Sequence, residues 1–193
     1  YQSGTLKLAG DVSAEVVSKN LPVEVTGELT GNLVIDWTSA PSGYVMTFAS
    51  EAVMEASKDN IALGQTQPGV VRLLHYYMDG TKAVAILVSN LVSSEAGLNV
   101  YLDVAAQQGM TDVTVLIGGS FDVANQVTVP ATITNLTIQD DGDATTGNTV
   151  TYTGSTDGLF IMHSGLKLTV KDISMSSTQK ALLKQTDGTT ELN

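Results

Sequence analysis

Short segments in which apolar and polar residues alternate make up most of the chain, and this pattern predicts β-strands that bury one face. In the first half, segments 33–37 and 44–48 lie on either side of a loop with Ser, Pro and Gly turn chemistry. Segments 70–78 and 83–89 are longer and strongly apolar, and the Asp79-Gly80 pair between them predicts a hairpin.

The second half contains short, threonine-rich apolar segments separated by Gly, Asp and Asn turns. The strands expected from them are 113–117, 126–129, 133–138, 149–153, 159–163, 166–173 and 181–184. One phrase returns, because Asn135-Leu136-Thr137-Ile138 comes back as Lys167-Leu168-Thr169-Val170. A strand that recurs in this way can stack on its own copy.

Two segments favour helices. Segment 51–62 has a partial apolar face, with Ser50 as a suitable N-cap and an acidic first turn. Segment 98–102 is compatible with a strand, and the alternative is a short helix over 102–108 that ends at Gly109.

The composition narrows the possible partners and sites. The 193 residues carry nine Lys+Arg against 20 Asp+Glu, a net charge of −11, so the clustered basic side chains that nucleic-acid binding needs are missing. The absence of cysteine excludes disulfides, thiolate zinc sites and cysteine nucleophiles. No run approaches the ~18 apolar residues of a membrane span. The C-terminus looks cut, which predicts a processed chain or a fragment of a longer protein.

The second half carries a resemblance to a known fold. Its phrases are Gly118-Gly119-Ser120-Phe121-Asp122, Val127-Thr128-Val129-Pro130 and Ile133-Thr134-Asn135-Leu136-Thr137-Ile138. They resemble the opening coils of a pectate-lyase-like right-handed parallel β-helix, as in secreted Bacteroidetes surface proteins. The resemblance implies that segment 102–109 is a capping helix before the first coil.

The first half resembles a different fold more weakly. Leu33-Val34-Ile35-Asp36-Trp37 and then Gly43-Tyr44-Val45-Met46-Thr47-Phe48 are similar to the second and third strands of a fibronectin type III sandwich, in which a Trp fills the core. The tyrosine-corner phrase of that family is not recognisable here. A generic Ig-like sandwich and a single mixed β domain therefore stay open.

Together these patterns predict an all-β chain with two parts. We expect residues 1–92 to form an antiparallel β-sandwich-like, Ig/fibronectin-like domain. We expect residues 93–193 to form a short parallel β-helix-like domain that is truncated or incomplete. Strands with two apolar faces, such as 113–117, need cover on both sides, and either arrangement supplies it.

One acidic cluster and one sequon are candidate sites. Asp140, Asp141 and Asp143 have the carboxylates that calcium prefers, but the EF-hand spacing is missing, and a solvated turn is the alternative. Asn135-Leu136-Thr137 is the one N-glycosylation sequon. The alternative for Asn135 is an inward side chain that stacks from coil to coil.

Aromatic residues are the candidate ligand-binding groups. Tyr76 and Tyr77 are adjacent on an expected strand, so one of them faces outward, where a sugar can stack on its ring. The alternative is a ring packed under a loop. Trp37 is a further candidate, and a place in the core is its alternative.

Catalytic patterns are missing, so we expect no enzyme. There is no Gly-x-Ser-x-Gly elbow and no P-loop, and the two histidines are isolated. We expect instead a non-catalytic extracellular or cell-surface protein that binds a glycan or a protein partner on a β scaffold. The first alternative is a structural subunit of a filament, surface layer or virion that binds copies of itself by strand exchange or β-edge contacts. A weaker alternative is a fragment of a polysaccharide lyase or glycoside hydrolase.

Overall fold

β-Strands make up most of the computed structural model, which describes residues 6–8, 16–37, 43–64, 69–142, 147–178, 180–186, 189 and 191–192. The described residues also contain two α-helices and one 3-10 turn. The all-β expectation is therefore confirmed. The chain forms two compact units, Tyr1–Ser89 and Asn90–Asn193.

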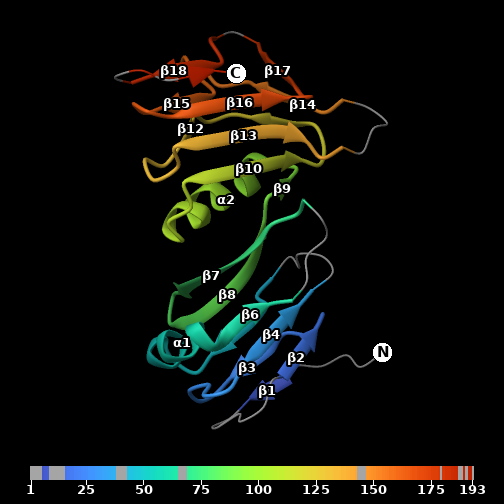
Figure 1. Ribbon diagram of the computed structural model, residues 1–193, viewed down its shortest axis with the longest axis vertical. Coiled ribbons are helices and arrows are strands. Elements are labelled where there is room, and N and C mark those ends of the chain that lie inside the picture. Colours follow the sequence, from blue (N-terminus) through green and yellow to red (C-terminus); the bar gives the residue numbers. More distant parts are fainter. Residues whose placement is uncertain are drawn as a thin grey trace. The chain divides into compact units, whose positions relative to one another are not determined.

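The first unit begins with six short strands and ends with a hairpin (Figure 1). Its elements are β1 (Leu6–Leu8), β2 (Val16–Lys19), β3 (Val23–Val25), β4 (Leu33–Asp36), β5 (Met46–Phe48), α1 (Glu51–Ser57), the 3-10 turn η1 (Lys58–Asn60), β6 (Ile61–Leu63), β7 (Arg72–Asp79) and β8 (Lys82–Ser89).

The first six strands pair in parallel, and the chain alternates between two sheets. Strands β1, β3 and β5 lie side by side in one sheet, and β2, β4 and β6 lie in the other. This differs from the antiparallel, sandwich-like arrangement expected for this part. Successive strands belong to different sheets, so a strand pairs with the second strand after it. Among the described residues, antiparallel pairing is confined to the β7–β8 hairpin and its attachment to β5.

Alternation along these strands builds the core of the first unit. Val23, Val25, Leu33 and Ile35 are each at most 1% exposed, and their neighbours in the strands face outward. Helix α1 starts as expected, with the Ser50 side chain accepting a hydrogen bond from the backbone N–H of its third residue. It ends at Ser57, earlier than expected. The apolar residues of β6 join the sheet instead, because β6 pairs with β4.

The hairpin expected from the Asp79-Gly80 pair is confirmed. Asp79 and Lys82 face each other in register, and only Gly80 and Thr81 lie between them. Gly80 has φ of 62°, a backbone conformation that costs glycine little.

The second unit is a stack of parallel strands that follows one helix. Its elements are β9 (Leu91–Val92), α2 (Glu95–Gln107), β10 (Asp112–Ile117), β11 (Phe121–Val123), β12 (Val127–Thr128), β13 (Asn135–Asp140), β14 (Thr149–Tyr152), β15 (Phe160–Met162), β16 (Lys167–Lys171), β17 (Ser174–Ser177), β18 (Leu183–Gln185) and β19 (Glu191–Leu192).

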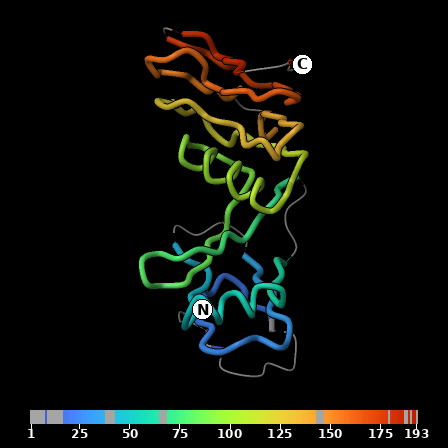
Figure 2. Tube along the Cα trace, turned by 90° about the vertical axis from the view of Figure 1, so that its left-hand side faces the viewer, coloured from blue at the N-terminus to red at the C-terminus, as the bar shows by residue number. Residues whose placement is uncertain are grey.

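After α2 the chain visits three sheets in turn and repeats the circuit. The first circuit is β10, β11 and β12, the second is β13, β14 and β15, the third is β16, β17 and β18, and β19 begins a fourth. Every pairing within these sheets is parallel. The circuits form layers that lie one on another (Figures 1 and 2).

The returning phrase stacks on its own copy, as the sequence predicts. Asn135 pairs with Lys167, and the next residues follow in register, through Leu136 with Leu168 to Ile138 with Val170. Strand β10 adds Val113 below Leu136. The resulting ladder of Val113, Leu136 and Leu168 is at most 2% exposed.

Helix α2 lies at the β10 end of this stack (Figure 1). It is longer than the helix expected over 102–108, and the strand considered for 98–102 is wrong. Leu98, Tyr101, Leu102 and Ala105 are buried at helical spacing and form its inner face. The helix begins at the N-cap Ser94, and Gly109 beyond its end has φ of 72°, as expected for a helix terminus.

Threonines beside strand ends make a contact that recurs in both units. Each donates its backbone N–H and its Oγ1 hydroxyl to the same carbonyl one layer earlier, with Oγ1–O distances from 2.8 to 3.5 Å. We name them the corner threonines, and the pairs are Thr26 with Leu8, Thr134 with Thr111, Thr153 with Val123, Thr178 with Tyr152, and Thr186 with Met162.

Glu95 ties the first turn of α2 to the turn after β11. Its carboxylate accepts hydrogen bonds from the backbone N–H of Ala124 at 2.8 Å, the backbone N–H of Asn125 at 3.2 Å and the Asn125 amide at 2.8 Å. Burial acts to raise the pKa of Glu95, but the hydrogen bonds outweigh it, and the pKa is lowered. The ionised carboxylate therefore stabilises the position of the helix.

Replacing Glu95 by Gln should lower the free energy of unfolding at neutral pH by about 1 kcal/mol, because charge-assisted hydrogen bonds are lost at a partly exposed site. Since the folded pKa lies below the ordinary 4.5, the contribution is present above that pH and is lost as the pH falls through the folded value. Urea unfolding of both proteins should show the difference shrinking in acid. The control Asp122→Asn, at an exposed β11 position, should change the stability by less than about 0.5 kcal/mol. Equal stability of the wild type and E95Q at neutral pH would contradict the contact.

Candidate functional site

The β7 strand divides its side chains between two faces. Leu74 and Tyr76 point into the core of the first unit, and the Tyr76 ring lies 6.1 Å from the Phe48 ring. Burial, and then the charge of Asp59, raise the pKa of the Tyr76 hydroxyl. Tyr76 is therefore a core residue and does not present its ring to a ligand.

The opposite face of β7 carries two aromatic rings. His75 and Tyr77 stack with their centroids 5.0 Å apart and their planes inclined by 18°. Both side chains are half-buried. Of the adjacent tyrosines, Tyr77 is therefore the one on the outward face. Asp79 follows two residues later on the same face and is exposed.

Tyr44 joins this group from the segment just before β5, which pairs with β8 on the side opposite to β7. The backbone N–H of Val45 donates to the carbonyl of Ala85, which is also the register partner of Met46. Two consecutive residues therefore oppose one, as in a β-bulge, and the strand is offset. The Tyr44 hydroxyl donates a hydrogen bond to the Asp79 carboxylate.

The contact with Asp79 raises the pKa of Tyr44 above its ordinary value. The hydrogen bond to Asp79 raises the pKa most, followed by partial desolvation and by the charges of Asp79 and Tyr77. We name the group formed by Tyr44, His75, Tyr77 and Asp79 the aromatic patch.

Trp37 lies outside the aromatic patch. It follows β4, is half-buried and packs against the core of the first unit. Its carbonyl accepts a hydrogen bond from Arg72, and its buried Nε1 has no partner among the described residues. Of the three aromatic residues proposed from the sequence, only Tyr77 is in the patch.

The acidic cluster after β13 closes its own turn. The Asp140 carboxylate accepts hydrogen bonds from the backbone N–H groups of Gly142 at 2.9 Å and Asn148 at 3.1 Å, and these bonds lower its pKa. Asp141 is next to it, and Asp143 lies outside the described residues. In the described part of the chain, no three acidic or histidine side chains are grouped to hold a metal ion.

Asn135 lies on the exposed face of β13. Its side-chain amide donates to the Asp112 carboxylate at 2.9 Å, on the strand one layer earlier. The inward, stacking position considered for this residue is therefore wrong. The sequon is at the surface, but its amide nitrogen already makes a hydrogen bond.

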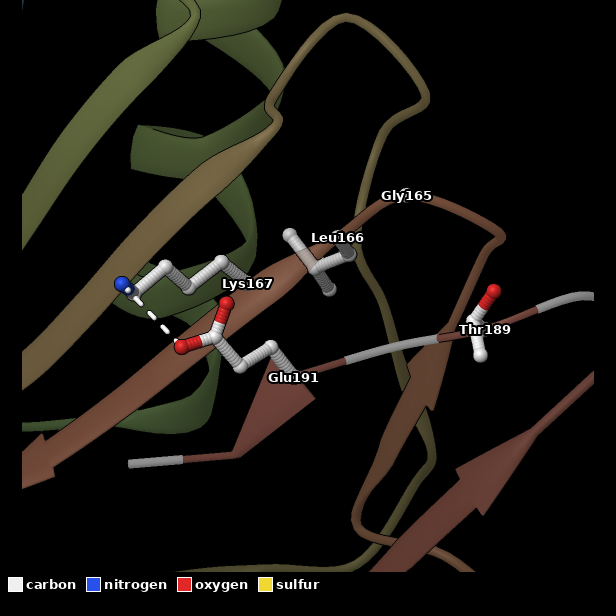
Figure 3. Close-up of a pocket in the computed structure, with 5 residues that line it drawn as sticks. All are labelled: Gly165, Leu166, Lys167, Thr189 and Glu191. Atoms are coloured by element: carbon white, nitrogen blue, oxygen red, sulfur yellow. Dashed lines mark ion pairs between the residues drawn. The ribbon is translucent and has the colours of Figure 1, made fainter.

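A hollow of about 270 Å³ lies between the start of β16 and β19, and Figure 3 shows its lining of Gly165, Leu166, Lys167, Thr189 and Glu191. Lys167 and Glu191 form an ion pair across 3.2 Å at its edge. The backbone N–H of Gly165 donates to the Thr189 carbonyl at 2.9 Å. Because its two charged groups bind each other, the hollow is a weaker candidate than the aromatic patch.

Comparisons of the chain with protein-family models, with curated proteins and with solved structures find no match. None of the described helices has the length and hydropathy that crossing a membrane requires. The function is therefore inferred from the geometry of the aromatic patch.

The Tyr44–Asp79 contact can be tested by titration. Asp79→Asn should lower the pKa of Tyr44 toward its ordinary 10.0, because the largest cause of the shift is removed. The tyrosinate absorbance should rise at lower pH in D79N than in the wild type. Tyr44→Phe serves as the control, since subtracting its curve isolates the Tyr44 signal. Superimposable wild-type and D79N curves would rule out the hydrogen bond in solution.

Proposed function

We propose that this chain is a non-catalytic protein of the cell surface or extracellular space that binds a glycan or a protein partner. The observation that carries the proposal is the pair of stacked rings, His75 and Tyr77, on the outward face of β7 beside the Asp79 carboxylate. Rings held on a strand present apolar area at low entropic cost, because the backbone and their mutual contact already fix them.

The chemistry of the patch favours binding over catalysis. Glycoside hydrolysis uses two convergent carboxylates, one of them as a proton donor. The aromatic patch contains one carboxylate, and it accepts a hydrogen bond from Tyr44. The Asp79 side chain is exposed, and a carboxylate has further acceptor sites for hydrogen bonds from a ligand.

The proposal also includes the fold of the second unit, which serves as a scaffold. We propose that it is a short parallel β-helix, as the resemblance of its phrases to pectate-lyase-like domains implies. The order in which the chain visits three parallel sheets supports this, as does the helix α2 before the first circuit. An acidic, cysteine-free chain fits a surface location.

The binding proposal predicts a loss of affinity when the outward ring is removed. On an array of glycans and in capture from a cell-surface protein extract, Tyr77→Ala should bind at least about tenfold more weakly than the wild type, as expected for a central aromatic contact. The control is Met78→Ala, an adjacent and 37% exposed side chain on the opposite face, which should bind as the wild type does. Undiminished binding by Y77A, or no ligand for the wild type, would refute the proposal.

A second candidate is a structural subunit that assembles through strand edges. The inner ladder of Val113, Leu136 and Leu168 continues to Leu192, which is 57% exposed. Strands β17, β18 and β19 each form the last strand of their sheet among the described residues. A sheet edge beside an exposed apolar side chain favours the addition of another strand.

Assembly can be measured by size exclusion with light scattering at micromolar concentration. If this candidate is right, the wild type forms oligomers or filaments and Leu192→Lys is monomeric, because a charge at the end of the ladder opposes the stacking of another layer. The control Val100→Lys places the same charge on α2, at a 39% exposed position, and should assemble normally. A monomeric wild type, or an L192K protein that still assembles, would exclude this route.

A further inference from the structure

We infer that His163 is a pH-sensitive clasp of the second unit. Its imidazolium holds the turn between β15 and β16 against the start of the preceding circuit, and the hold weakens when the ring loses a proton. The clasp lies outside the aromatic patch and is independent of the ligand proposed for it.

Both ring nitrogens of His163 face backbone carbonyl oxygens. Nε2 lies 2.9 Å from the oxygen of Ile133, and Nδ1 lies 2.9 Å from the oxygen of Ser164. A carbonyl oxygen only accepts, and a neutral imidazole has a single N–H to donate, so one of the two contacts would bring lone pairs together. The imidazolium donates to both oxygens. The site therefore fits the charged ring better than the neutral ring.

The two contacts join successive circuits. Ile133 is fully buried and lies just before β13, at the start of the second circuit. The His163 carbonyl accepts a hydrogen bond from the backbone N–H of Leu166 at 3.3 Å, which closes the turn that leads into the third circuit. The Nδ1 contact thus fixes the ring to its own turn, and the Nε2 contact ties that turn to the circuit before it.

His163 replaces a corner threonine as the side-chain donor of this layer. Leu166 and Thr134 are equivalent in register, because each is the residue just before its strand, β16 or β13. Thr134 donates its hydroxyl to a carbonyl one layer earlier, whereas a leucine side chain has nothing to donate. A hydroxyl donates at every ordinary pH, but the charge of a histidine changes between about pH 5 and 8.

The next layer is attached to the same turn. The backbone N–H of Gly165 donates to the Thr189 carbonyl at 2.9 Å, and the backbone N–H of Glu191 donates to the Leu166 carbonyl at 3.1 Å. These four residues line the hollow beside β19 (Figure 3). Loosening the turn should therefore weaken the attachment of β19 as well.

The charged groups around the ring are engaged elsewhere or keep their charge. Residues 129–134, which contain the Nε2 acceptor, include no titratable side chain. On the adjoining strands, at this end, the charged residues are Asp112 on β10, Lys167 on β16, Lys184 on β18 and Glu191 on β19. Asp112 accepts from Asn135, and Lys167 pairs with Glu191. Carboxylates and ammonium groups ordinarily stay charged between about pH 5 and 8, so the response in this range comes from the histidine.

The test is hydrogen exchange of the full chain, read by mass spectrometry on a peptide over residues 163–170, in the wild type and in His163→Gln. A glutamine amide can donate to one carbonyl and does not titrate in this range. The contribution of the clasp is present in mildly acidic solution and is lost as the pH rises and the ring is deprotonated. The wild-type peptide should therefore exchange about fivefold more slowly than that of H163Q near about pH 5.5, and within about twofold of it near about pH 8.

The matched control is His75→Gln, the same substitution at the other histidine, which lies in the first unit. It should leave the exchange of residues 163–170 and its pH dependence as in the wild type. Comparing proteins at the same pH removes the effect of pH on chemical exchange itself. A ratio of wild type to H163Q that is the same at both pH values would overturn the inference, and so would loss of the pH dependence in H75Q.

A second measurement does not require H163Q to fold. H75Q contains His163 as its single histidine, so nitrogen-15 NMR of this protein reports that ring alone. Near about pH 5.5, two ring N–H protons should be observed in slow exchange with water, because both are hydrogen-bonded to carbonyl oxygens. A ring with one observable N–H proton, or with none, would overturn the clasp.

Discussion

Parallel, in-register pairing between a strand and the strand one circuit later is the constraint on which the second unit depends. It places each residue directly over its equivalent, so Leu136 lies on Leu168 and Thr137 on Thr169. Apolar residues then form continuous inner ladders, and polar residues stay at the surface. A shift of one residue would expose every inner side chain, which is why the register is strongly specified. The six short strands at the start of the first unit follow the same rule with two sheets.

The strands could be predicted from the sequence far better than their partners. Period-two alternation and the Asp79-Gly80 turn identify the β7–β8 hairpin, because both are local properties of the chain. The pairing of β1 with β3 is not local, because β2 lies between them in the chain and belongs to another sheet, and no side-chain pattern records that. The sequence therefore predicts an antiparallel first unit, whereas its first six strands pair in parallel. The corner threonines close the ends of strands with their hydroxyls, a role that the threonine-rich segments of the sequence do not reveal.

The candidate site could likewise be predicted from the sequence only where it depends on local properties of the chain. Tyr77 could be chosen from the sequence, and its strand neighbours His75 and Asp79 follow from the two-residue period once β7 is recognised. Tyr44 could not, because its place beside Asp79 requires both the attachment of β8 to β5 and the offset at Val45. Trp37 and Tyr76 are candidate ligand-binding residues in the sequence, but in the structure they pack against the core. Residue type alone does not distinguish a core ring from an exposed one.

The spacing of the stacked strands has a consequence for how such a chain can change. Asp112, Asn135, Lys167 and Glu191 lie in one column although intervals of 23, 32 and 24 residues separate them. The register of the strands therefore does not depend on the length of the connections, because the entropy cost of closing a loop grows only slowly with its length. Residues can be inserted between two strands, as between β13 and β14, while the hydrogen-bonded layers remain as they are. The strands and the segments that connect them can therefore diverge in sequence at different rates. Because the connecting segments differ in length, the repeat has no fixed period along the sequence.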